Sequence, residues 1–370
     1  MEIHRRHGFD KAMFFTTLAL MTLGLIMVFS TSGVAAAQKY NRPLYFLFQQ
    51  VLGAVFGLAL IGLVLAFKKP FYQHPVFVFG LLLITLGLLC LCFLMPVVAG
   101  TNRWIILPGF RFQPSELAKI SLVLFLAWYL DLRKERIQEW PVLLVPLGVT
   151  LLSVLLILNE PDFGTALLTF GLCAALLFLG GLKAKRFAAL VLFSLPLFIF
   201  YVASAQYRID RLLAFFSPAK NLQNQNFQVA QSKLAVGAGG LIGVSLGEST
   251  QKMFFLPCAH TDFIFAIIGE ELGFLGALAT LVLFIVILWR GVVISMRAPN
   301  LFSQLTAAGL TLLIAVQALL NISVVLGLSP AKGVPLPFLS FGRSSLMINL
   351  AAIAILLHIS QRRETNRNSA

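Results

Sequence analysis

The residues of this chain that could do chemistry are the few ionisable side chains within or beside long apolar stretches. Each charge in such a stretch costs roughly 2.5–3.5 kcal/mol on membrane-insertion scales, so each is a functional candidate. Asp262 begins an apolar stretch and follows His260 by two residues. Its carboxylate could be a general base, could cap the helix predicted there, or could do both. His260 could relay a proton or be a hydrogen-bonded structural residue.

A second candidate is the pair Glu116 and Lys119, which follows Pro114 at the start of another apolar stretch. Proline suits the first turn of a helix, and residues three apart lie on one helical face, so the two charges are predicted to pair. Such a pair could line a polar site. It could also neutralise itself and fix a helix without taking part in chemistry.

Three further acids have similar surroundings. Glu270 and Glu271 are adjacent, so about 100° of helical rotation separates them and they cannot share one face. They could hold helices together or carry a proton or ion. Asp162 follows Pro161 between two apolar stretches, where it could cap the second stretch or contact a substrate.

The elements that position these residues must be membrane helices, because the composition excludes a soluble protein. Of the 370 residues, 59% are hydrophobic and 11% are charged, and the mean hydropathy is +0.91. Four cysteines are too few for a disulfide-rich secreted scaffold. The net charge of +14 comes mostly from short basic clusters between apolar stretches, which is typical of membrane topology. We therefore expect membrane lipid and no nucleic acid among the partners.

The predicted fold is an all-α polytopic membrane protein of about ten transmembrane helices, in a single domain covering residues 1–370. A bilayer core about 30 Å thick requires about 20 apolar residues per helix, and ten stretches approach that length. No convincing internal repeat is present. The predicted helices are 12–33, 44–67, 74–97, 114–132, 141–158, 164–182, 187–206, 263–289, 301–328 and 343–360.

The basic clusters fall in alternate connections, which predicts that both termini are cytoplasmic. The opposite, outer side then receives segments 98–113, 159–163 and 329–342, and a large loop, 207–262, between helices seven and eight. Connections longer than ~15 residues tend to be functional or disordered. The apolar residues and glycines of the 207–262 loop favour a folded extracytoplasmic loop at the membrane surface.

The predicted outer side also carries basic residues, although the positive-inside rule predicts that Lys and Arg concentrate in the cytoplasmic connections. Arginine and lysine bind phosphate oxygens well, so these residues predict an anionic, pyrophosphate-bearing ligand, although any one of them could be a solvated surface charge. They are Arg103, Arg111, Arg208, Arg211, Lys233 and Lys252.

Six ordered blocks extend along nearly the whole chain. They are Arg103-Trp104 with Phe112 to Glu116 and Lys119, Pro161 to Thr165, Gln231 to Lys233, His260 to Phe265, Gly269 to Gly273, and Lys332 to Pro337. Together they resemble the FtsW/RodA (SEDS) family of bacterial peptidoglycan polymerases. Within the family, Gln251-Lys252 and Ala331-Lys332-Gly333 are more similar to the cell-division member, FtsW, than to the elongation member, RodA.

The resemblance implies an inverting glycosyltransferase that polymerises lipid II, the undecaprenyl-pyrophosphate-linked disaccharide, on the outer face of the bacterial cytoplasmic (inner) membrane. It also implies a class B penicillin-binding protein, a transpeptidase, as partner. In a division role, other divisome proteins would join them at the septum.

The resemblance assigns the essential carboxylate to Asp262 and matches Glu116 and Lys119 to a central polar cavity. Together with the residues discussed above, it predicts a catalytic Asp262 and a substrate-binding set. That set is Arg103, Glu116, Lys119, Asp162, Arg208, Lys233, Lys252, His260 and Ser344.

Three positions depart from the family pattern. Cys258 stands where the family normally has Glu, and Glu160 stands where Gln is common. Arg343, just before Ser344, replaces a glycine that permits close backbone approach, and it could add a phosphate contact. None of these changes removes Asp262.

The sequence leaves the metal requirement and three alternatives open. A divalent cation, Mg²⁺ or Mn²⁺, could offset charge on the pyrophosphate alongside the basic residues, but no DxD-like pair is evident and no cofactor is assigned. The alternatives are a lipid II flippase, a non-catalytic scaffold for the transpeptidase, and an elongation role of the RodA type.

Overall fold

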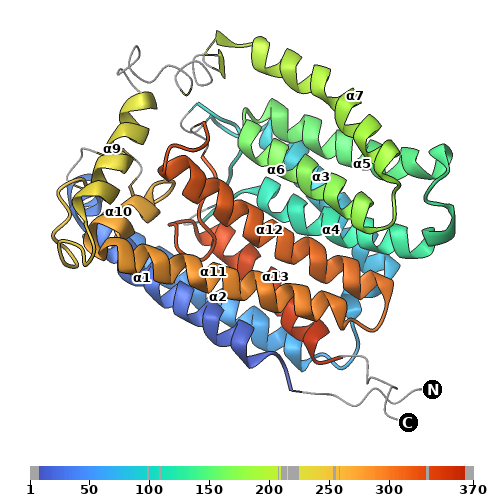
Figure 1. Cartoon of the computed structure of the whole chain (residues 1–370), viewed down its shortest axis with the longest axis horizontal. Helices are drawn as coiled ribbons and strands as arrows, with labels where there is room; N and C mark the ends of the chain where they lie inside the picture. The colour runs from blue at the N-terminus through green and yellow to red at the C-terminus, as the bar shows by residue number, and fades with distance from the viewer. Residues whose placement is uncertain are drawn as a thin grey trace.

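The computed structural model is almost entirely helical, as Figure 1 shows. It describes residues 8–97, 100–107, 110–206, 208–209, 215, 225–252, 256–257, 259–330 and 333–362. The helices are α1 (Lys11–Tyr40), α2 (Tyr45–Ala66), α3 (Pro75–Cys92), α4 (Pro114–Leu132), α5 (Trp140–Asn159), α6 (Phe163–Leu179), α7 (Ala184–Ala203), α9 (Gln225–Ala238), α10 (Ile264–Glu271), α11 (Gly273–Met296), α12 (Leu301–Val325) and α13 (Arg343–Ser360). Short 3₁₀ helices cover Phe71–Gln73 and Lys134–Arg136, and strands β1 (Ile105–Leu107) and β2 (Phe110–Phe112) form an antiparallel hairpin.

Some of the helices begin at a residue whose side chain satisfies a free backbone N–H group. The Asp10 side chain accepts a hydrogen bond from Met13 at the start of α1, and the Asn300 side chain caps α12 in the same way. Proline occupies the first turn of α3, α4 and α5, where it sacrifices no helical hydrogen bond.

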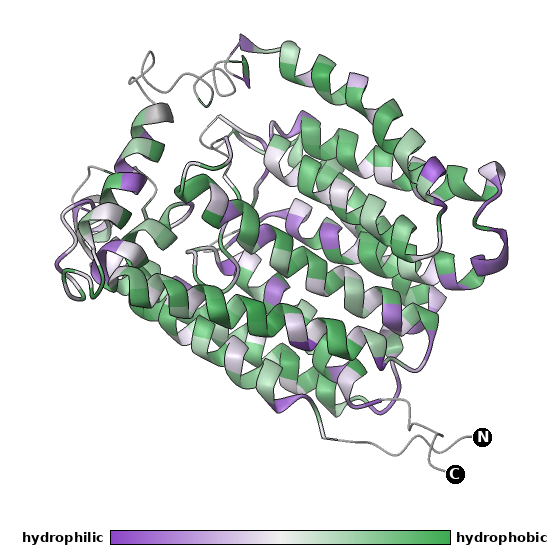
Figure 2. Cartoon of the chain, viewed as in Figure 1, coloured by the Kyte–Doolittle hydropathy of each residue, from purple (hydrophilic) through white to green (hydrophobic). Residues whose placement is uncertain are grey.

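The predicted polytopic membrane fold is confirmed. In the described part of the chain, eight helices are long and apolar enough to cross a membrane, namely α1, α2, α3, α5, α7, α11, α12 and α13. The predicted spans 114–132 and 164–182 correspond to α4 and α6. α4 contains Glu116, Lys119 and Asp131, and α6 is a shorter apolar helix of 17 residues. Figure 2 shows apolar residues along the helices and hydrophilic residues mostly at the connections.

Predicted span 263–289 is wrong as one continuous helix. The chain forms α10 and α11 with a break at Leu272, and Gly273 has a φ of +64° that only glycine adopts readily. The loop after α9 packs against the backbone at this break. Gly243 lies so close to it that a Cβ on this residue would be 2.2 Å from the carbonyl oxygen of Glu271. This close approach between distant backbone segments is not visible in the hydrophobic pattern.

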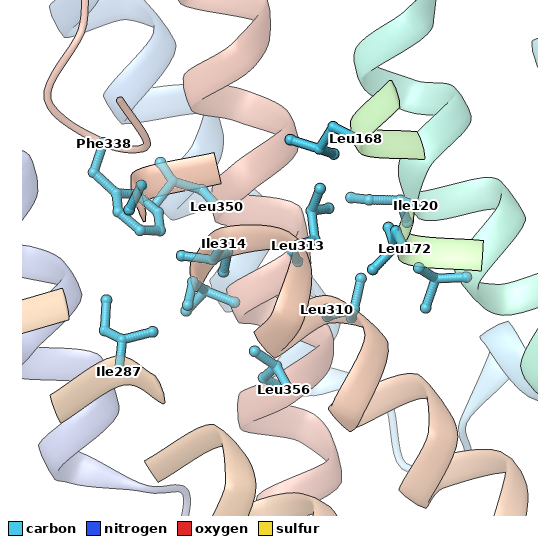
Figure 3. Close-up of a cluster of buried hydrophobic side chains, with 14 of the residues drawn as sticks. Ile120, Leu168, Leu172, Ile287, Leu310, Leu313, Ile314, Phe338, Leu350 and Leu356 are labelled. Atoms are coloured by element: carbon cyan, nitrogen blue, oxygen red, sulfur yellow. The ribbon is translucent and has the colours of Figure 1, made fainter. Parts of the chain in front are cut away.

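The buried core runs through α4, α6, α12 and α13, whose facing side chains interdigitate in Figure 3. Leu310 and Leu313 of α12 lie opposite Ile120 of α4 and Leu172 of α6. In contrast, α7 has no buried residue, and Phe193 on it is 89% exposed. Large exposed apolar side chains on outward faces suit a lipid environment.

The first and last described helices meet at one end of the bundle. The backbone N–H of Asp10 donates to Ser360 Oγ at 3.0 Å, and Asp10 also forms an ion pair with Arg290 of α11. The opposite end of the bundle, which contains β1, β2, α9 and the start of α10, is called the outer end below.

Candidate active site

Asp262 lies at the outer end, two residues before α10 begins. The Asn321 side chain of α12 donates to the Asp262 carbonyl at 2.8 Å and to the Val334 carbonyl at 2.8 Å, so one amide holds both segments. A Cβ on Gly333 would lie 3.2 Å from Asp262 Oδ2. The backbone of Asp262 is therefore held beside the 333–337 segment, and its half-buried carboxylate lies next to Gly333.

The predicted capping role of Asp262 is wrong. Phe263 is the N-cap residue of α10, and no side chain accepts a capping hydrogen bond there. Asp262 therefore precedes the N-cap position rather than occupying it.

The chain just before Asp262 is fixed by aromatic and backbone contacts. The ring of His260 packs 4.9 Å from Phe46 and 5.8 Å from Phe341, measured between centroids. The Phe341 N–H donates to the His260 carbonyl at 2.9 Å, and Ser340 Oγ donates to the Thr261 carbonyl at 2.5 Å. This packing between two phenylalanines favours the structural interpretation of His260.

Glu116 and Lys119 pair as predicted and lie at the centre of a buried polar network. Lys119 Nζ is 2.7 Å from Glu116 Oε1, and both side chains are 2% exposed. Lys119 also donates to Gln317 Oε1 at 3.4 Å, while Ser345 Oγ donates to Glu116 Oε2 at 3.2 Å. The pair thereby joins α4, α12 and α13.

Gln317 connects this network to the segment beside Asp262. Its Nε2 donates to the Pro335 carbonyl at 3.2 Å, next to the Val334 carbonyl that Asn321 binds. Gln317 and Asn321 are four residues apart on α12, so they project from one face. A displacement of the Glu116–Lys119 pair would therefore reach the Asp262 region through two neighbouring amide side chains.

A second polar cluster surrounds Asp162. Its Oδ1 accepts from the Thr165 N–H at 3.0 Å, which caps α6, and its Oδ2 accepts from Arg103 and from Gln113, each at 3.3 Å. The capping interpretation of Asp162 is thus confirmed. The side chain of Arg103 is 29% exposed and also lies 5.7 Å from the ring centroid of Trp104, so it is held in place while still reaching the surface.

Glu270 and Glu271 hold the loop after α9, which confirms their predicted packing role. Glu270 accepts from Ser249 Oγ at 2.5 Å and from the Thr250 N–H at 3.1 Å. Glu271 accepts from Ser30 Oγ at 2.7 Å and pairs with Lys252 Nζ at 2.9 Å, with side-chain exposures of 0% and 5%. Lys252 is thus committed to a buried ion pair, and the expectation that it offers an open phosphate contact is not supported.

Removing one charge of this pair is expected to loosen the loop. Lys252→Met would leave Glu271 buried without its cation, which costs several kcal/mol for an ion pair of this kind. We expect faster proteolytic cleavage in residues 239–252 and a lower unfolding midpoint in detergent. Glu248→Gln, an exposed change in the same loop, is the control, and equal cleavage of both variants would contradict the anchoring role.

The remaining predicted cations lie on separate elements. Arg208 donates to the Tyr201 carbonyl at 2.6 Å and stacks 3.6 Å from the centroid of the Tyr201 ring, at the end of α7. Lys233 is exposed on α9 beside Gly327. Arg343 places its guanidinium 4.2 Å from the ring centroid of Phe110, so it joins α13 to the hairpin.

Ser344 is buried in the first turn of α13, and its neighbour Ser345 makes the contact with Glu116. Arg111 is exposed on β2. Cys258, Arg211 and Lys332 lie outside the described residues.

The described residues contain no group of three or more His, Cys, Asp or Glu side chains that could hold a metal ion. We assign no step of the reaction to a metal.

Sequence reasoning missed Gln317, Asn321, Ser345 and Gln113 as members of these networks. One signal was available, since Gln317 and Asn321 are amides at i and i+4 in an apolar helix, a pattern that indicates polar contacts between membrane helices. Their carbonyl partners at Pro335, Val334 and Asp262 come from the tertiary fold.

These features define a multi-pass membrane protein with a polar, partly buried site at one end of its helical bundle. A sequence model of the FtsW/RodA/SpoVE family of cell cycle proteins matches residues 10–365, and the chain belongs to this family.

Named relatives and a solved structure resemble the chain over nearly its full length. A probable peptidoglycan glycosyltransferase FtsW from Geobacter metallireducens is 39% identical over 96% of this chain and 95% of its own. Stage V sporulation protein E from Bacillus subtilis is 40% identical over 95% of this chain and 97% of its own. A chain of a peptidoglycan synthase complex, solved to explain how polymerization and crosslinking are coordinated, has a TM-score of 0.79 at 28% identity, covering 97% of this chain and 99% of that one.

Proposed function

We propose that the protein is a peptidoglycan glycosyltransferase that polymerises lipid II at the outer face of the bacterial cytoplasmic membrane, with Asp262 as general base. The full-length similarity to proteins named as this enzyme supports the activity. The observation that supports the site is the position of Asp262: its backbone is held by Asn321, and its half-buried carboxylate lies beside Gly333 at the outer end.

In the proposed reaction, the 4-hydroxyl oxygen of the acceptor sugar bonds to the anomeric carbon of the donor. The bond from that carbon to the pyrophosphate oxygen breaks, so the undecaprenyl pyrophosphate leaves with the bonding electrons. Asp262 accepts the hydroxyl proton as the new bond forms. Attack from the face opposite the leaving group inverts the anomeric carbon. A single base is sufficient, because pyrophosphate leaves without prior protonation.

Cations at the outer end would offset the charge that grows on the leaving pyrophosphate. Arg103 and Lys233 are the described candidates, since the first reaches the surface and the second is exposed. Lys252 is excluded from this role by its ion pair with Glu271.

We also propose a cell-division role, at the septum, with a class B penicillin-binding protein and other divisome proteins as partners. The FtsW names of several relatives support this role over elongation. The Bacillus subtilis relative is named for sporulation, so a role in that process is the alternative that the comparison raises. The structural similarity to a chain of a peptidoglycan synthase complex supports a transpeptidase partner.

The test is polymer formation from labelled lipid II by the purified protein, alone and with its class B partner. We expect long glycan chains that a muramidase digests, and a higher yield when the partner is present. No polymer with any candidate partner, together with lipid II transfer across vesicle membranes, would contradict the proposal in favour of a flippase. No activity of either kind would favour a scaffold.

A further inference from the structure

Glu160 is a buried acid that the proposed reaction does not use. It follows the last residue of α5 and precedes the capping residue of α6 by two positions. Its side chain is 0% exposed, and among the described residues no nitrogen or oxygen donor binds either carboxylate oxygen, so its one close donor there is the weakly donating thiol of Cys92. A buried acceptor without a strong donor is costly if the group is charged and much less costly if it is neutral.

Three ionisable groups face Glu160, and each comes from a different position in the fold. They are the thiol of Cys92 at the end of α3, the carboxylate of Asp162 in the same turn, and the guanidinium of Arg103. Arg103 binds Asp162 through Nη1, and its buried Nε has no hydrogen-bond partner in the part of the chain that the structure describes. One cation therefore faces two acids, and it already pairs with one of them.

Burial of the carboxyl, followed by the negative charge of Asp162, raises the pKa of Glu160 to about 8, and the hydrogen bond from the Cys92 thiol and the charge of Arg103 only partly oppose this effect. A protonated carboxyl can both donate and accept a hydrogen bond and carries no charge. Glu160 in this state therefore adds a titratable proton to the turn rather than a fixed charge.

We propose that Glu160 is a proton-binding site that controls Arg103. While Glu160 holds its proton, Arg103 stays with Asp162 and keeps its exposed part at the outer surface. When the proton leaves, the second carboxylate competes for the same guanidinium and draws its free Nε inward. The effect on polymerisation rests on the proposed function, in which Arg103 offsets charge on the pyrophosphate, whereas the proton site itself does not.

The first test measures the proton without any activity. Infrared difference spectra of the protein in detergent, recorded between pH 6 and pH 10, should contain the carbonyl stretch of a protonated carboxylic acid that disappears as the pH rises. Glu160→Gln should remove this band, while Glu248→Gln, at an exposed site, should keep it. An unchanged band in Glu160→Gln would overturn the assignment. Loss of the wild-type band on adding Mg²⁺ at constant pH would overturn it in favour of a cation site.

The second test uses stability. The pKa of Glu160 is higher in the folded state than the ordinary value of about 4.3 expected after unfolding, so between these values the folded protein holds a proton that the unfolded chain has lost. Wild-type stability should therefore fall relative to Glu160→Gln as the pH rises toward 8, by up to about tenfold in the unfolding equilibrium constant per pH unit. A constant difference between the two unfolding midpoints from pH 5.5 to pH 8.5 would contradict the proposal.

The third test separates this proposal from the proposed function. Wild-type polymerisation should decline above pH 8 more steeply than that of Glu160→Gln, and the two should match near pH 6.5. If wild type makes no polymer at any pH, the proposed function fails, but the infrared and stability results still decide the proton site. Identical pH profiles in two active proteins would overturn the control of Arg103.

Discussion

Asp262→Ala is expected to abolish measurable polymer formation from lipid II while the protein still folds. A positioned general base typically contributes 10²–10⁴-fold to a rate, so we expect a loss of at least about 100-fold. The fold should tolerate the change, because the contact between Asn321 and residue 262 uses the backbone carbonyl, which alanine retains. The measurement is initial rate with labelled lipid II, alongside the unfolding midpoint.

Asp262→Glu is the sharper companion variant because it keeps the charge. One added methylene displaces the carboxylate from the position at which it would accept the hydroxyl proton. We expect most activity to be lost. A scaffold would tolerate this change in cells. Wild-type rates in both variants would place the base elsewhere.

The second large effect is expected at the buried pair of Glu116 and Lys119. Lys119→Met leaves Glu116 without its cation in a site that is 2% exposed, and breaking a buried pair in this way costs roughly 3–5 kcal/mol. We expect a large drop in the unfolding midpoint and loss of polymerisation, because Gln317 also loses its contact with Lys119.

The double variant Glu116→Gln with Lys119→Met distinguishes stability from function. It removes both charges, so much of the stability should return, while polymerisation should stay low if the charged pair serves the site. Glu139→Gln is the matched control: it breaks the exposed pair of Arg136 and Glu139, also three residues apart, and should leave both readouts unchanged. Recovery of full activity in the double variant would show that the pair only stabilises the fold.

Much of the fold could be predicted from the sequence, because each membrane-spanning helix requires a long apolar stretch and each stretch can be recognised from its own local sequence. The position of α13 was predicted to the residue, and the Glu116–Lys119 pair followed from helical spacing. The break between α10 and α11 was not predicted, since it depends on Gly243 packing against the Glu271 carbonyl, a contact between segments far apart in sequence.

The candidate site was predicted less completely for the same reason. Charged residues are conspicuous in apolar sequence, so Asp262, Glu116 and Lys119 were identified. Whether a cation such as Lys252 faces solvent or is buried against Glu271 depends on tertiary packing that spacing does not encode. Gln317 and Asn321 carry no charge, and their carbonyl partners come from the 333–337 segment and the Asp262 backbone.

The contact between Asp10 and Ser360 has a practical consequence for engineering the chain. Because α1 starts where α13 finishes, the two ends of the helical bundle lie next to each other. A short linker could join the two ends covalently, and new termini could be opened in the connection between α6 and α7, on the same side of the membrane. Such a circular permutant would keep every helix pair and would carry a fluorescent tag beside the peripheral helix α7, away from the outer end.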